Sequence, residues 1–184
     1  LVMFLFLILN MFKKNLFATP IWQRIMPIEL NNGLLEESTQ FAGNIFDMNL
    51  TYTNKLKNII RDLYITINYE YGLEERTIHG RLNIINYGEN DTPHSHIGKS
   101  LLVGVYYLDV EIDTGDLLLH DPRGGVVWDN LDFEPNDPIK EKTSRTYHRI
   151  KPVNGLLIMF PGYLVHSVEN NMNKKTRKSI VINI

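Results

Sequence analysis

Two histidines in the segment DTPHSHIGKS have the spacing of metal ligands. His94 and His96 are two positions apart, so in an extended strand both imidazoles project to the same side and can bind one ion. A helix would direct them to different faces. A turn precedes the pair and the apolar stretch LLVGVYYLDV follows it, which favours extended backbone here. Taken alone, the pair also fits two solvated loop histidines.

The carboxyl-terminal segment adds a third histidine and an arginine. His166 lies within the apolar run YLVHSV, where a histidine is often a core residue with a hydrogen-bonded ring. Arg177 follows eleven residues later, and strand alternation places it on one face with Ser179. A guanidinium and a hydroxyl on one face suit a carboxylate ligand. On its own, an Arg-x-Ser at the start of a strand is usually solvent-facing.

Helices are expected before these motifs. Residues 51–64 carry apolar side chains at helical spacing with charged residues between them, which predicts an amphipathic helix. The apolar positions are Leu56, Ile59, Ile60 and Leu63. A second, shorter helix is expected near residues 31–44.

Short β-rich runs separated by turn residues dominate the rest of the chain, and they predict an antiparallel sandwich or jelly roll. The runs are residues 65–71, 77–87, 100–110, 116–120, 147–151, 155–160, 164–169 and 178–184. The polar segment 126–146 is expected to be a surface loop of the kind that often covers a site.

Composition narrows the chemistry. The 184 residues are 43% hydrophobic and 22% charged, which is typical of a soluble globular protein. Lys and Arg total 19 against 21 for Asp and Glu, so there is no basic excess for general nucleic-acid binding. The absence of cysteine excludes disulfides, thiolate metal sites and cysteine nucleophiles. A metal ion would therefore bind to His, Asp or Glu.

The amino terminus of the chain is strongly apolar. Leu1 to Leu9 form an apolar run that is too short to span a bilayer, which takes about 20 residues. The cations Lys13 and Lys14 follow this run, which is the reverse of a secretory signal. We expect residues 1–10 to be an over-extended gene start before Met11, with a membrane-surface anchor as the alternative. A cytoplasmic protein without a membrane span is predicted.

The order of the motifs resembles the 2-oxoglutarate- and Fe(II)-dependent oxygenases. The resemblance is carried by NIINYGENDTPHSHIGKSLLVGVYYLDVEIDTGDLLLHDPR and by FPGYLVHSVENN with TRKSIVINI. These stretches look like a small bacterial and phage subfamily that carries a His-x-His, a GVYYL strand and an Asp-Pro-Arg. Its members end with a Phe-Pro, His-Ser-Val and Arg-x-Ser series. The resemblance covers residues 11–184.

The resemblance implies a mainly β fold, a double-stranded β-helix (jelly roll) with amino-terminal helices. It implies one oxygenase domain over residues 1–184, with an amino-terminal layer at 11–76 and the β-helix core at 77–184. The implied cofactors are Fe(II) and 2-oxoglutarate, with His94 and His166 as metal ligands. Arg177 and Ser179 would bind the distal carboxylate of 2-oxoglutarate, and Tyr87 would line its pocket.

The chain departs from the family pattern at the third ligand. Most members of the superfamily use two histidines and one carboxylate, but the residue two after His94 is His96. Either His96 completes a three-histidine site, which its motif position favours, or a carboxylate such as Asp121 does so. Alternation in GDLLLHDPR places Asp121 on one face with Leu117 and Leu119. Arg123 would contact an anionic group or pair with Asp121.

The expected activity is hydroxylation of a small-molecule or peptidyl substrate, with release of succinate and CO2. Two alternatives stay open. A cupin-type enzyme with three histidines would not use 2-oxoglutarate and would be indifferent to loss of Arg177. A non-catalytic β-sandwich would use the histidines for packing and would show no metal dependence in its stability. The prime substrate and the oligomeric state are not indicated.

Overall fold

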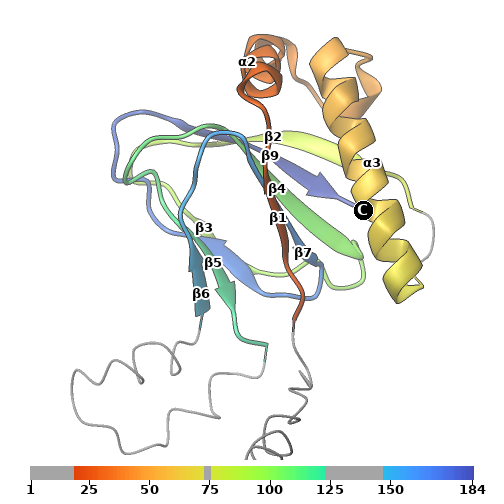
Figure 1. Cartoon of the computed structure of the whole chain (residues 1–184). Helices are drawn as coiled ribbons and strands as arrows, with labels where there is room; N and C mark the ends of the chain where they lie inside the picture. Colours follow the sequence, from red (N-terminus) through yellow and green to blue (C-terminus); the bar gives the residue numbers. More distant parts are fainter. Residues whose placement is uncertain (1–18, 73–75, 123–146) are drawn as a thin grey trace, which may run out of the picture.

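Two antiparallel sheets face each other in the computed structural model, which describes residues 19–72, 76–122 and 147–184. The five-stranded sheet has the order β1 (Trp22–Ile25), β7 (Leu156–Pro161), β4 (Leu102–Asp109), β9 (Arg177–Asn183) and β2 (His79–Ile85). The four-stranded sheet has the order β3 (Asp91–His94), β8 (His166–Val168), β5 (Leu117–His120) and β6 (Tyr147–Ile150). This arrangement confirms the predicted mainly β jelly roll (Figure 1).

Alternate residues of the larger sheet serve two separate cores. On one face, Tyr106, Leu108 and Ile180 pack with the helices in the first core. On the other face, Val105 and Tyr107 pack against residues of the smaller sheet in the second core. The period-two alternation of the strands therefore gives the larger sheet two buried faces, and the second core fills the sandwich interior.

Two α-helices cover the outer face of the larger sheet (Figure 1). They are α2 (Ile28–Glu37) and α3 (Thr51–Tyr71), and the 3-10 turns η1 (Ser38–Gln40) and η2 (Ile45–Asp47) lie between them. Glu37 joins the two helices, because its carboxylate accepts hydrogen bonds from the backbone N–H groups of Tyr52 and Thr53, both 2.8 Å. The α3 helix ends at Gly72, whose φ of 62° is the left-handed conformation that favours glycine at this position.

The predicted strand at residues 65–71 is wrong, because these residues are the last turns of α3. The buried stripe of the helix continues through Tyr64 and Ile67 at helical spacing. Ile65 and Tyr69, which the strand pattern would have buried together, are 58% and 95% exposed. The short helix expected near 31–44 starts earlier and is α2, and β1 was not predicted.

Some predictions fall outside the described residues. These are the apolar run before Met11, the segment 126–146 and Arg123. Among the helices that the structure describes, none is long and apolar enough to cross a membrane.

Candidate metal centre

The fold brings the three predicted histidines together. His94 ends β3 and His166 begins β8, and the two residues are paired directly across the strands, with ring centroids 4.3 Å apart. His96 lies in the turn after β3, where its backbone N–H donates to the carbonyl of Gly162 at 2.8 Å. One ligand atom from each ring lies within 4.8 Å of the other two. The three side chains can therefore bind a single metal ion.

Two backbone hydrogen bonds fix the orientation of two of these rings. Nδ1 of His94 lies 2.7 Å from the carbonyl oxygen of Thr92, and Nδ1 of His166 lies 2.9 Å from that of Leu164. A carbonyl oxygen only accepts hydrogen bonds, so each Nδ1 carries the proton. Each Nε2 then keeps its lone pair for a metal, which is the usual arrangement around ligating histidines.

Burial disfavours the charged form of two of the three histidines. It lowers the pKa of His166 to about 4, because the charged form is disfavoured away from water. Burial also lowers the pKa of His96, and a hydrogen bond with the Asn183 side chain opposes that shift. Since a histidine must be neutral to ligate a metal, these shifts prepare both rings for binding at neutral pH.

No acidic side chain of the described residues joins the three-histidine group. Leu117 and Leu119 are buried as the alternation predicted, but β5 ends at His120. Asp121 follows the end of the strand, so the alternation no longer determines where its side chain points. His96, and not Asp121, is the third side chain beside His94 and His166.

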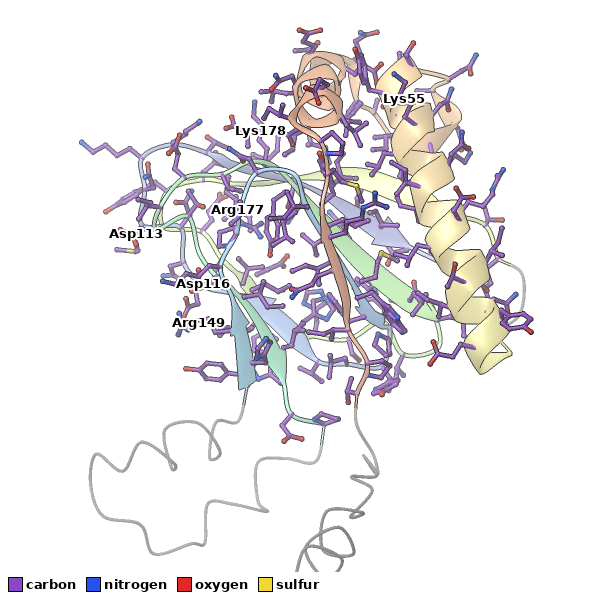
Figure 2. The ribbon with its side chains drawn as sticks, in the orientation of Figure 1. Lys55, Asp113, Asp116, Arg149, Arg177 and Lys178 are labelled. Carbon is purple, nitrogen blue, oxygen red and sulfur yellow. The ribbon has the colours of Figure 1, made fainter. Side chains whose placement is uncertain are left out.

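Arg177 lies between the two sheets as the first residue of β9 (Figure 2). Its side chain is only 1% exposed. Nη1 donates to the Oγ of Ser179 at 3.2 Å, and the guanidinium carbon lies 5.1 Å from the ring centre of Tyr107. In the part of the chain that the structure describes, the other two nitrogens, Nε and Nη2, have no hydrogen-bond partner. Burial lowers the pKa of Arg177 and raises that of Tyr107 to about 12.

One cleft between the sheets contains both the histidines and Arg177. The empty space between its walls, counted together with open solvent at its mouth, is about 380 Å³. Besides the three histidines, Arg177 and Ser179, its polar lining residues are Arg81, Asn83 and Asp91, and the remaining lining residues are Val or Leu. A ligand in this cleft would meet cationic groups and the candidate metal ligands, with valine and leucine side chains beside them.

The structure does not bring Tyr87 into this cleft. Its side chain is 60% exposed and is not part of the cleft lining. Arg81 and Asn83 of β2 do line the cleft, and alternation would have placed Tyr87 on the same face if the strand had continued. The strand ends at Ile85, and a turn with Gly88 at a φ of 80° follows. The turn therefore takes the tyrosine to the surface.

Four residues in or beside the cleft were missed from the sequence: Arg81, Asn83, Asp91 and Tyr107. Asn83 is paired with Ser179 in the sheet register, so alternation along β2 was a usable signal for it and for Arg81. Tyr107, whose ring lies beside the Arg177 guanidinium, was not among the predicted site residues. Asp91 had no usable signal, because it is three residues from His94, an odd spacing that predicts opposite faces of a regular strand.

A known protein family matches the part of the chain that contains this site. The model of the family described as "Putative 2OG-Fe(II) oxygenase" matches residues 82–183. A comparison with curated protein sequences finds no match.

Solved structures of three enzymes have a similar fold. A Pseudomonas putida prolyl-4-hydroxylase is 16% identical with a TM-score of 0.68, and the match covers 91% of this chain and 85% of that one. The non-heme alpha ketoglutarate dependent epimerase SnoN from nogalamycin biosynthesis is 11% identical with a TM-score of 0.59, over 89% of this chain and 76% of that one. The non-heme monooxygenase ThoJ, in a nickel complex, is 12% identical with a TM-score of 0.58, over 89% and 72%.

These low identities establish a common fold and no more. The family match is the stronger finding, since it covers more than half of the chain and includes all three histidines, Arg177 and Ser179. The chain therefore belongs to the 2-oxoglutarate- and Fe(II)-dependent oxygenase family.

Proposed function

We propose that this chain is a 2-oxoglutarate-dependent dioxygenase that hydroxylates a small-molecule or peptidyl substrate. His94, His96 and His166 would hold Fe(II), and Arg177 with Ser179 would hold the distal carboxylate of 2-oxoglutarate. When bound, Fe(II) and 2-oxoglutarate would supply the chemistry by which O2 oxidises a substrate C–H bond. Succinate and CO2 would be the co-products.

The buried guanidinium of Arg177 is the observation that carries this proposal. Its Nε and Nη2 have no hydrogen-bond partner among the described residues, although leaving a buried charged donor unpaired costs about 1–3 kcal/mol or more. A carboxylate accepts two parallel charge-assisted bonds from such a fork. Ser179, whose Oγ already contacts Nη1, has a hydroxyl proton to offer the same carboxylate. An anionic ligand would therefore complete the hydrogen bonding at this point.

The residues around the site support the same function. Val103, Val105 and Leu117 line the cleft, and their apolar side chains exclude water and so strengthen the attraction between Arg177 and an anion. The Nε2 atoms of His94 and His166 keep their lone pairs because of the backbone bonds at Nδ1. The chain's contribution is thus to hold both ligands in one cleft in fixed orientations.

The test is an anaerobic titration with Fe(II) followed by 2-oxoglutarate. The readout is the visible absorption band that a 2-oxo acid gives when it binds Fe(II). We expect a band with the native protein and a far weaker response with Arg177→Met. Arg149→Met is a matched control, because Arg149 forms surface ion pairs with Asp116 and Glu169 and lies outside the cleft. His96→Ala tests whether this ring is the third ligand.

Other outcomes would contradict the proposal. Iron binding without the band would favour a three-histidine metalloenzyme that does not use 2-oxoglutarate. Absence of iron binding in the native protein would favour a non-catalytic β-sandwich. An unchanged 2-oxoglutarate response in Arg177→Met would show that another group binds the distal carboxylate.

A further inference from the structure

The three-histidine group leaves the candidate metal centre without a negative ligand. In the more common set of two histidines and a carboxylate, the carboxylate neutralises part of the metal charge. Neutral histidines contribute no charge, and burial lowers the pKa of His166 and His96. A divalent cation in this cleft would also face the positive charge of buried Arg177. A compensating negative charge close to the histidines would therefore favour metal binding.

Asp91 is the acidic side chain that lines this cleft, and no other does among the described residues. It lies in β3, three residues before His94. The other charged groups of the lining are Arg81 and Arg177, apart from the histidines themselves.

An irregularity in β3 explains how Asp91 faces the cleft. Asp91 pairs with Val168 of β8, and His94 pairs with His166. The chain therefore advances three residues along β3 while it advances two along β8, which is the count of a β-bulge. His166 and Val168 share one face of β8 and both line the cleft. The extra residue in β3 brings Asp91 to the same face as His94, where a regular strand would have turned it away.

The Asp91 carboxylate affects both the histidine group and Arg177. Its charge favours the protonated form of His166 and the charged form of Arg177, in each case against the effect of burial. Asp91 is nevertheless outside the group of ligand atoms that lie within 4.8 Å of one another. It lies near the metal ligands without being one of them in this structure.

We propose that Asp91 supplies the negative charge that the three-histidine centre lacks, and that it does so from outside the ligand group. The inference rests on the proposed metal centre and deepens it. Asp91 acts on a bound cation by electrostatic attraction and by accepting hydrogen bonds from water on the metal. The bulge in β3 is the structural device that places it there, in line with the frequency of bulges beside active sites.

The test measures Mn(II) affinity of the full chain, with the EPR signal of free Mn(II) as the readout. Asp91→Asn should bind Mn(II) about 10–100-fold more weakly than the native protein, the loss typical of residues that support metal ligands from outside. Asp91→Ser should change the affinity in the same direction. Asp121→Asn is the matched control and should leave the affinity unchanged, because Asp121 is not part of the cleft lining.

A second readout separates the charge effect from structural damage. At saturating Mn(II), Asp91→Asn should bind 2-oxoglutarate more tightly than the native protein, because a negative charge near a dianion has been removed. Opposite shifts for the cation and the anion are the signature of electrostatics, whereas a loosened site would weaken both.

Several results would overturn the proposal. Unchanged Mn(II) affinity in Asp91→Asn would show that its charge does not act on the metal. A loss as complete as that of His166→Ala would make Asp91 a ligand. Weaker binding of both Mn(II) and 2-oxoglutarate would indicate a structural role. A native protein that binds Mn(II) but not 2-oxoglutarate would contradict the proposed function alone, and the Mn(II) measurement would still decide the role of Asp91.

Discussion

Replacing Arg177 with methionine should stabilise the ligand-free protein and abolish its stabilisation by 2-oxoglutarate. Methionine is flexible and apolar, so it can fill the space of the arginine stem among the apolar residues of the cleft. The change removes a guanidinium that is almost fully buried and has two nitrogens without partners. Loss of the Arg177 side chain, which we propose binds 2-oxoglutarate, should therefore raise the free energy of unfolding.

The magnitude follows from the contacts of the side chain. Two unpartnered charged donors destabilise the folded state by about 1–3 kcal/mol each. Their removal is offset by loss of the bond to Ser179, worth about 1.5–3 kcal/mol, and of the contact with the Tyr107 ring, worth about 0.5–2 kcal/mol. The central values leave a net stabilisation of about 0.5 kcal/mol. For a chain of this length, that raises the melting temperature by about 1–2 °C.

Chemical and thermal unfolding with and without ligand is the assay. In the presence of Mn(II), 2-oxoglutarate at 100 times its Kd should stabilise the native protein by about 2.7 kcal/mol and the Arg177→Met variant not at all. The control Arg149→Met should keep the ligand effect, because Arg149 is a surface residue. A ligand-free variant that is less stable than the native protein would show that the guanidinium is satisfied in the folded state. Undiminished stabilisation by 2-oxoglutarate would refute the assignment of Arg177 as its anchor.

Three further predictions concern the ring, the turn and the helix pair that support the site. The metal-free protein should lose up to about 3 kcal/mol of stability as the pH falls from 6.5 towards 4. The reason is that His166 takes up a proton in the unfolded chain but stays neutral when it is buried in the folded protein. Equilibrium unfolding measured against pH should show a flatter profile for His166→Asn. Gly162→Ala should lower the free energy of unfolding by about 1–3 kcal/mol, because the added Cβ would collide with the carbonyl oxygen of Ser100. It should also weaken Mn(II) binding, because the Gly162 carbonyl accepts the backbone hydrogen bond of His96. An Mn(II) affinity equal to that of the native protein would contradict this. Glu37→Ala should lower the free energy of unfolding by about 1–2 kcal/mol, because the first N–H groups of α3 lose their acceptor, and urea denaturation would measure the change.

The strands and the histidine group could be predicted from the sequence because their signals are local or repeat along a strand. Apolar runs mark β4 and β9, since the side chains of these strands are buried on both faces of the sheet. His94 and His96 are two residues apart, so their spacing alone keeps them close, although β3 ends at His94. The pairing of His94 with His166 is long-range, and it was expected from the order of motifs in a family and not from any periodicity.

The errors arose where the local pattern and the tertiary structure disagree. The alternation of apolar residues in 65–71 is typical of a strand, but the buried face of the helix extends through Ile67. Tyr87 has the right parity for the cleft, yet the strand ends before it. Asp91 has the wrong parity, and a bulge corrects it. In each case the deciding event is where a strand begins, ends or gains a residue, which depends on partners far along the chain.

The position of Arg177 explains how the fold tolerates an unpaired charge. β9 lies between β4 and β2, so its backbone is held on both sides. Ile180 and Ile182 of the same strand pack into the core beneath the helices. Those contacts fix the strand whether or not a ligand is bound, and they offset the cost of burying the guanidinium. Arg177 is therefore held in the orientation that we propose for binding before any ligand arrives, so less ordering would be required when one binds. The same reasoning predicts that Ile180→Ala should weaken 2-oxoglutarate binding and lower the free energy of unfolding, although Ile180 faces away from the cleft. An unchanged affinity for 2-oxoglutarate in a folded variant would show that the packing beneath β9 does not position Arg177.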